Sequence, residues 1–161
     1  MNTVNLSFKD LVRDPRLLLA FGFGSGLSPK APGTFGTIAA LPFVFLLQAS
    51  PIYIYLAVLV IGFAIGVYLC EHASKVMGVH DHGGIVWDEF IGMWLAMLAV
   101  PLGWQWLLAG FILFRIFDIA KPWPIGWLDK KVSGGFGIMI DDVLAGLYAL
   151  LILQLAAFYL R

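Results

Sequence analysis

The chain has 161 residues, of which 61% are hydrophobic and 12% are charged, with a mean hydropathy of +0.91 and a formal net charge of zero. A soluble domain of this length carries roughly twice that share of charged residues, so the composition predicts a single-domain integral membrane protein with an all-α fold. The zero net charge gives no indication of nucleic-acid binding, and the lone Cys70 excludes an internal disulfide.

The first twenty residues carry more charge than the apolar segments that follow. They mix apolar side chains with Lys9, Arg13 and Arg16, and Ser7 can cap a short helix that ends before Pro15. We expect residues 1–20 to form a surface segment whose bases face anionic lipid headgroups. The early charges also argue against a secretory signal peptide.

A loop rich in glycine and proline follows at residues 22–37 and contains Lys30, Thr34 and Thr37. Such a loop presents backbone N–H groups that can bind phosphate. The alternative is that its glycines and prolines only form a tight turn before a membrane helix, with Lys30 as a surface lysine. No strand is expected before the loop, so a dinucleotide-binding fingerprint is not supported.

Hydropathy predicts a polytopic helical bundle with about five short membrane helices. The first two run from Thr34 to Gln48 and from Ile52 to Cys70, and the last covers Val143 to Leu160. The stretch from Phe90 to Phe114 is either one long helix or a hairpin that turns at Pro101–Gly103. The hairpin leaves every Lys and Arg except the C-terminal one on the side of the N-terminus, so the positive-inside rule favours the hairpin and makes that side cytoplasmic.

Two acidic pairs, Asp88-Glu89 and Asp141-Asp142, each come directly before an apolar segment. One acid of each pair can cap a helix, but capping does not require two adjacent carboxylates twice. Arg115 and Asp118 share a helix face, where they form either a simple ion pair or part of a functional site. Carboxylates gathered with bases, in a chain with almost no thiol, suit Mg²⁺ and a phosphate better than zinc.

His80 and His82 lie on either side of Asp81 in the polar segment between Glu71 and Trp87. In a loop both imidazoles could face one way and serve as metal ligands or as a proton shuttle. A purely structural role is the alternative.

Four stretches, in this order, closely resemble the phosphatidylglycerophosphatase A family over about residues 22–160. They are Pro29–Thr34 with Gly36-Thr37, Trp87–Gly92, Phe114–Asp118 with Lys121–Ile125, and Gly134–Gly146. The resemblance implies a multi-pass protein of the bacterial inner (cytoplasmic) membrane. It also implies a Mg²⁺-dependent phosphatase that converts phosphatidylglycerophosphate to phosphatidylglycerol and phosphate in phospholipid biosynthesis. Membrane lipids surround such an enzyme, and the sequence gives no sign of an obligate protein partner.

On this basis we expect residues 1–161 to form one membrane-embedded phosphatase domain, with its active site facing the cytoplasm. The expected catalytic residues are Asp88, Glu89, Asp118 and Asp142. The expected Mg²⁺ ligands, which would also include a general base, are Asp88, Glu89, Asp118, Asp141 and Asp142. The residues expected to contact the substrate phosphate are Lys30, Arg115 and Lys121, with Thr34 and Thr37 as lesser contacts. Asp129 could join either set.

Two other functions were compared with this one. A small-anion transporter also carries charges and broken helices within the membrane, but this sequence lacks the inverted repeats common in transporters. A CDP-alcohol phosphotransferase is disfavoured because no Asp-Gly-x-x-Ala-Arg motif occurs.

Overall fold

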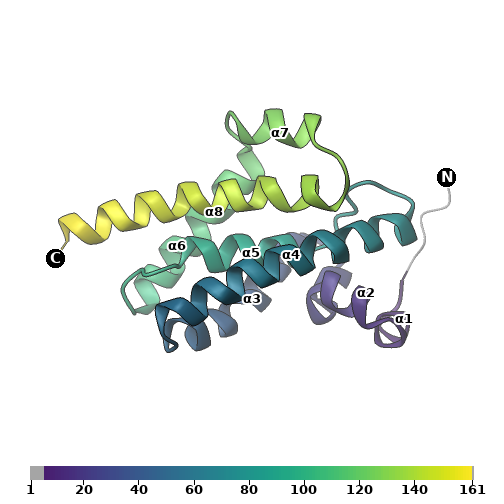
Figure 1. Ribbon diagram of the computed structural model, residues 1–161, viewed down its shortest axis with the longest axis horizontal. Helices are drawn as coiled ribbons and strands as arrows, with labels where there is room; N and C mark the ends of the chain where they lie inside the picture. The colour runs from purple at the N-terminus through teal and green to yellow at the C-terminus, as the bar shows by residue number, and fades with distance from the viewer. Residues whose placement is uncertain (1–5, 161) are drawn as a thin grey trace.

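The computed structural model describes residues 6–160, and all regular structure in that part of the chain is helical, which confirms the all-α prediction. The longer helices run along the long axis of the molecule, and α1 and α2 lie at one end (Figure 1). The elements are α1 (Phe8–Arg13), α2 (Pro15–Ala20), the 3₁₀ segment η1 (Gly22–Leu27), α3 (Pro32–Gln48), α4 (Ile52–Met77), α5 (Trp87–Ala96), α6 (Trp104–Ala120), α7 (Ile125–Lys131) and α8 (Gly134–Tyr159).

The short helix α5 forms the centre of the core. It packs on α3, α4, α6 and α8, and of its ten residues only Leu95 is not buried. The ring of Phe90 stacks on that of Trp87 at 5.6 Å between centroids and meets the ring of Trp94 edge-on at 5.8 Å. Because α5 is enclosed on all sides, the acids of its first turn, Asp88 and Glu89, lie inside the protein.

The segment from Phe90 to Phe114 is a hairpin, as predicted. α5 ends at Ala96 and α6 begins at Trp104, with the helix-breaking Pro101 and a Gly103 of positive φ between them. Glu89 near the start of α5 lies 3.6 Å from Arg115 in the second half of α6, so the two helices run antiparallel. The hairpin therefore brings the polar ends of both helices together.

Two predicted helix boundaries were wrong. α4 continues past Cys70 to Met77, because Glu71 and Lys75 form an ion pair of 2.8 Å one turn apart and Gly78 ends the helix in the left-handed conformation. α8 begins at Gly134, well before the predicted start at Val143. Asp141 and Asp142 thus lie in the interior of a helix and cannot cap it, which removes the capping explanation for that pair.

Residues outside α8 stabilise its early start. The N–H of Gly134 donates to Nε2 of His80, and the N–H of Gly135 donates to a carboxylate oxygen of Glu71, both at 2.7 Å. Two of the free N–H groups of the first turn are satisfied in this way by α4 and the loop after it. Because of these tertiary contacts, α8 begins at two glycines, although glycine by itself disfavours a helix.

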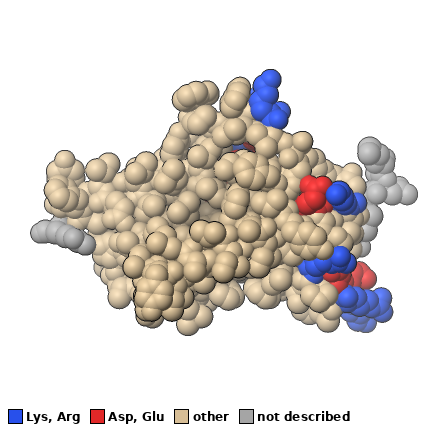
Figure 2. Space-filling view, in the orientation of Figure 1, with Lys and Arg blue, Asp and Glu red and all other residues tan. Residues whose placement is uncertain are grey.

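Within residues 6–160, two helices, α4 and α8, are long and apolar enough to cross a membrane, whereas about five had been predicted. α3 and α6 have 17 residues each, or about 25 Å, and α5 has ten, so they fall short of the roughly 30 Å hydrocarbon layer. Figure 2 shows that on the face in view the charged side chains gather toward one end of the molecule and at the tip near α7. The remainder of that face is uncharged.

Helix α2 packs against the second half of α4, and α1 packs against α2. Asp14 caps α2 by accepting from the N–H of Arg16, and its carboxylate also lies 2.8 Å from Nε2 of His72 on α4. Hydrogen bonds from Arg16 and His72 hold the pKa of Asp14 well below its usual value. Leu11 is fully buried while Lys9 and Arg13 stay exposed, so the described part of this segment has one packed and one basic face.

We predict that Gly146→Ala destabilises the protein. A Cβ at Gly146 would collide with the carbonyl oxygen of Gly92, which can move only if α5 shifts. Alanine favours the helix by about 1 kcal/mol, but overpacking costs about 1–3 kcal/mol, so the midpoint of thermal unfolding in detergent should fall. Gly83→Ala is the control, because its Cβ would meet only Pro32 at 3.8 Å. Equal midpoints for the two variants would contradict this packing.

Candidate active site

Three carboxylates from two helices meet in the core. Asp88 and Glu89 come from the first turn of α5 and Asp142 from α8, and one oxygen of each lies within 4.8 Å of the others. All three residues are buried. This is the only such cluster of potential metal ligands found within residues 6–160.

Small residues one turn beyond the acids bring the two backbones this close. Gly92 follows Asp88 by four residues, and Gly146 follows Asp142 by four. A Cβ on Gly92 would lie 2.8 Å from the carbonyl oxygen of Asp142, and one on Gly146 would strike Gly92. Close contact at the glycines therefore places the carboxylates of the preceding turn against each other.

Each acid of this cluster has an oxygen without a hydrogen-bond partner among the described residues. These atoms are Oδ1 of Asp88, Oε2 of Glu89 and Oδ2 of Asp142. Buried carboxylates with free oxygens repel one another and lack solvation, which a cation would supply. Three convergent carboxylates, with no imidazole or thiol in the cluster, fit a hard ion such as Mg²⁺.

Arg115 of α6 lies at the edge of the acidic cluster. Its Nη1 pairs with Asp118 one turn along α6 and lies 3.6 Å from Oε1 of Glu89. Its Nε–H is buried and has no partner among the described residues. Asp118 in turn lies close enough to Asp142 for their carboxyl groups to interact. The predicted Arg115–Asp118 pair thus joins the acidic cluster.

Lys121 lies apart from Arg115, with its own acids. Its ammonium donates to Asp141 at 2.6 Å and to Asp129 of α7 at 2.9 Å. Burial lowers the pKa of Lys121, but the hydrogen bonds to Asp141 and Asp129 outweigh this effect and raise it above its usual value. Asp141 and Asp142 are adjacent on α8 and contact different neighbours, so the structure divides the predicted ligands into a three-acid cluster, the Arg115–Asp118 pair and the Lys121–Asp141–Asp129 group.

The start of α3 borders the site through a glycine that sequence reasoning missed. A Cβ on Gly33 would collide with Oε1 of Glu89 and lie 3.2 Å from the guanidinium of Arg115. The predicted contact residues nearby differ in their environments. Lys30 is exposed, Thr34 is half-buried, and the buried Thr37 donates its hydroxyl to the carbonyl of Gly33 at 2.8 Å.

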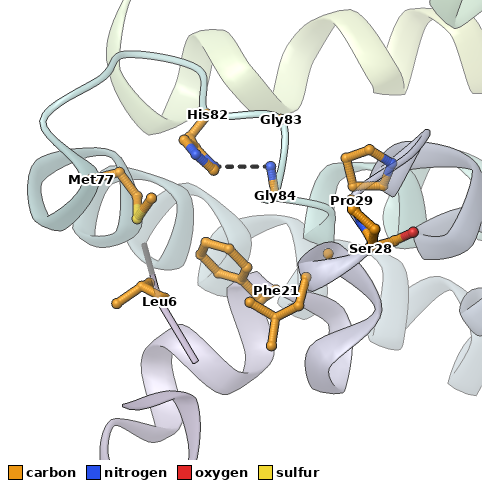
Figure 3. A pocket seen from close by; sticks show the side chains of 11 residues that line it. Leu6, Phe21, Ser28, Pro29, Met77, His82, Gly83 and Gly84 are labelled. Atoms are coloured by element: carbon orange, nitrogen blue, oxygen red, sulfur yellow. Dashed lines mark hydrogen bonds between the residues drawn. The ribbon is translucent and has the colours of Figure 1, made fainter. Parts of the chain in front are cut away.

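The histidines of the polar loop make structural hydrogen bonds. His80 accepts from the start of α8, and Nδ1 of His82 accepts from the N–H of Gly84 at 3.0 Å. Figure 3 shows His82 beside Phe21 and Met77 at a cavity of about 300 Å³, which the carboxylate cluster does not line. Asp81, between the two histidines, lies close enough to Lys121 and Asp129 for their charges to interact.

The profile of the family described as Phosphatidylglycerophosphatase A matches residues 18–157. The chain belongs to the phosphatidylglycerophosphatase A family. This membership confirms the resemblance found in the sequence and the expectation that the chain is a phosphatase.

Relatives in other bacteria carry the family's name. A phosphatidylglycerophosphatase A of Escherichia coli K12 is 59% identical over 134 residues, covering 83% of this chain and 78% of the relative. One of Haemophilus influenzae is 52% identical over 141 residues, covering 86% of each. A Bacteroides thetaiotaomicron protein named "Putative phosphatidylinositol-3-phosphatase" is 39% identical over 148 residues, covering 87% of this chain and 92% of the relative. No solved structure matches the chain.

We predict that Lys121→Met destabilises the protein because it leaves the buried Asp141 carboxylate without its cation. Losing one partner of a fully buried pair costs about 3–5 kcal/mol, and the partial exposure of Lys121 should reduce this to about 2 kcal/mol. Adding Asp141→Asn to the same variant should recover part of the loss. Unfolding of the purified variants in detergent measures both effects. Lys130→Met, at an exposed lysine, is the control, and a loss equal to that of Lys121→Met would contradict the pairing.

Proposed function

We propose that this chain hydrolyses phosphatidylglycerophosphate to phosphatidylglycerol and inorganic phosphate, and that the reaction depends on Mg²⁺. The observation that carries the proposal is the cluster of Asp88, Glu89 and Asp142, with its free buried oxygens, directly beside Arg115. Anionic ligands for a metal next to a guanidinium form an arrangement that can promote hydrolysis of a phosphomonoester. The names of the family and of two relatives support the choice of substrate.

The residues take distinct roles in this proposal. Asp88, Glu89 and Asp142 would hold Mg²⁺, which would supply an activated water and offset the charge of the phosphate. Arg115 binds the phosphate through its guanidinium. Asp118 would hold Arg115 in place and, near Asp142, would serve as general base or additional ligand. Asp141 supports the site by fixing Lys121.

The other residues predicted to contact the phosphate take secondary roles in this proposal. Lys121 would have to leave Asp141 or Asp129 to bind substrate, so we assign it to the electrostatics around the phosphate. Lys30 and Thr34, close in sequence to Gly33, would approach the substrate from the start of α3. Thr37 already donates its hydroxyl to the carbonyl of Gly33, so it would have to break that bond to donate to the phosphate.

We further propose that α3, α4, α5, α6 and α8 all lie in the inner membrane, with the site at its cytoplasmic face. α4 and α8 would span the bilayer, and the shorter helices would pack against them or sit in a thinned layer. On the face shown in Figure 2 the charged side chains gather toward one end and at the tip near α7, which supports this arrangement. The basic face of α1 and α2 would then rest on anionic headgroups.

We predict that Asp88→Asn, Glu89→Gln and Asp142→Asn each lower phosphate release by roughly 100-fold or more, because each removes an anionic ligand from the metal site. The measurement is phosphate released from phosphatidylglycerophosphate by purified protein in detergent, with and without Mg²⁺. Asp10→Asn is the control, since Asp10 lies on α1 and bonds to Ser7. Phosphatidylinositol 3-phosphate is the comparison substrate. If the unmodified protein releases no phosphate from either lipid, the function is wrong and the transport alternative gains support.

We predict the topology to be visible by labelling. In a Cys70→Ser background, a cysteine at Leu102 in the α5–α6 turn should react with a membrane-impermeant maleimide added from the periplasm, because Leu102 is exposed and lies at the end of α6 away from Arg115 and Asp118. A cysteine at Ser133, before α8, should be protected in the same cells. The reverse pattern would place the site on the periplasmic side.

A further inference from the structure

We propose that one acyl chain of the lipid substrate binds along an apolar track formed by α3 and α6, which leads to Arg115. This inference rests on the proposed function, because it takes the substrate to be a lipid phosphomonoester. It adds the location and the residues of the hydrocarbon-binding site.

The track consists of two adjoining hollows that share Phe111. The first, of about 290 Å³, lies where Ile38 and Leu41 of α3 face Trp104 and Leu108 of α6. The second, of about 450 Å³, follows the face of α6 from Phe111 to Ala120. From Trp104 to Arg115 the track covers eleven helical rises, or about 16 Å, parallel to the axis of α6. That direction and length suit an extended hydrocarbon chain.

Arg115 joins the track to the active site. It is the only charged residue that lines either hollow, and the same side chain lies 3.6 Å from Glu89 of the carboxylate cluster. Its buried Nε–H has no partner among the described residues. Gly33 leaves room beside its guanidinium at the start of α3. An occupant that satisfies both parts of this surface has an apolar body and an anionic head.

A third hollow shows why the track differs from ordinary lipid-facing surface. It holds about 200 Å³ between α4, α5 and α8 and is lined by apolar residues such as Val60, Phe63 and Leu95. No charged residue lines it, so it offers nothing to the head of an anionic lipid. An apolar hollow alone does not select a substrate, whereas the track, with Arg115 at its end, selects an anionic lipid.

The test compares Leu108→Trp, which fills the track, with Val60→Trp, which fills the third hollow; both side chains are exposed in the structure. Hydrolysis of dioleoyl and of water-soluble dibutanoyl phosphatidylglycerophosphate is measured for each. Leu108→Trp should lower the ratio of kcat/KM for the long over the short substrate by about tenfold, mainly through KM. Val60→Trp should leave this ratio as in the unmodified protein. Equal ratios for both variants would overturn the proposal.

A second readout does not depend on the variants being folded. The unmodified protein is photo-crosslinked to a phosphatidylglycerophosphate that carries a diazirine in its acyl chain, with excess unlabelled lipid as competitor. Competed crosslinks should concentrate in residues 104–116 of α6 and around Ile38 and Leu41 of α3. Crosslinks spread over all apolar helices, or a second copy of the chain crosslinked at this face, would overturn the proposal. If the protein hydrolyses neither the long-chain nor the short-chain substrate, the proposed function itself is wrong. If it hydrolyses both and Leu108→Trp leaves their ratio unchanged, only the proposed track is wrong.

Discussion

The close approach of α5 and α8 is the contact on which the rest of the site depends. Gly92 and Gly146 let the two backbones touch, and one turn earlier this contact presses Asp88, Glu89 and Asp142 together in the core. A larger residue at either glycine would separate the helices and the carboxylates with them. Packing and function are therefore set by the same contact, and the free energy gained by burying α5 among its neighbours offsets the cost of gathering like charges.

Around that contact, acids outnumber bases. Six acids gather there with only two bases, Arg115 and Lys121. The acids are Asp88, Glu89, Asp118, Asp129, Asp141 and Asp142. Each base takes two carboxylates, Arg115 those of Asp118 and Glu89 and Lys121 those of Asp129 and Asp141. Asp88 and Asp142 have no basic partner among the described residues. This local excess of negative charge is the physical reason to assign a divalent cation there, and Arg115, at the boundary with the apolar track, is where an anionic lipid would approach.

Much of this arrangement could be predicted from the sequence. The hairpin followed from Pro101 and Gly103 together with the distribution of Lys and Arg, and the acidic pairs and Arg115 followed from charge placed beside apolar runs. Contacts distant in sequence could not be predicted. The start of α8 depends on His80 and Glu71, and the partners of Lys121 come from α7 and α8. Gly33, in a loop with many glycines, gave no sign that it borders Glu89. Five membrane helices were predicted because hydropathy registers short buried segments such as α5 as strongly as it does long ones.

Binding of Mg²⁺ to the carboxylate cluster is the central claim, and thermal unfolding in detergent tests it without relying on turnover. The midpoint for the unmodified protein should rise as Mg²⁺ is added at constant ionic strength, because an ion bound only to the folded state stabilises it by about 2.7 kcal/mol at 100 times its Kd. A Glu89→Gln/Asp142→Asn variant, with one carboxylate of the three left, should show no such rise. The account would be contradicted if Mg²⁺ left the unfolding midpoint of the unmodified protein unchanged, or if it raised the midpoint of the double variant by as much.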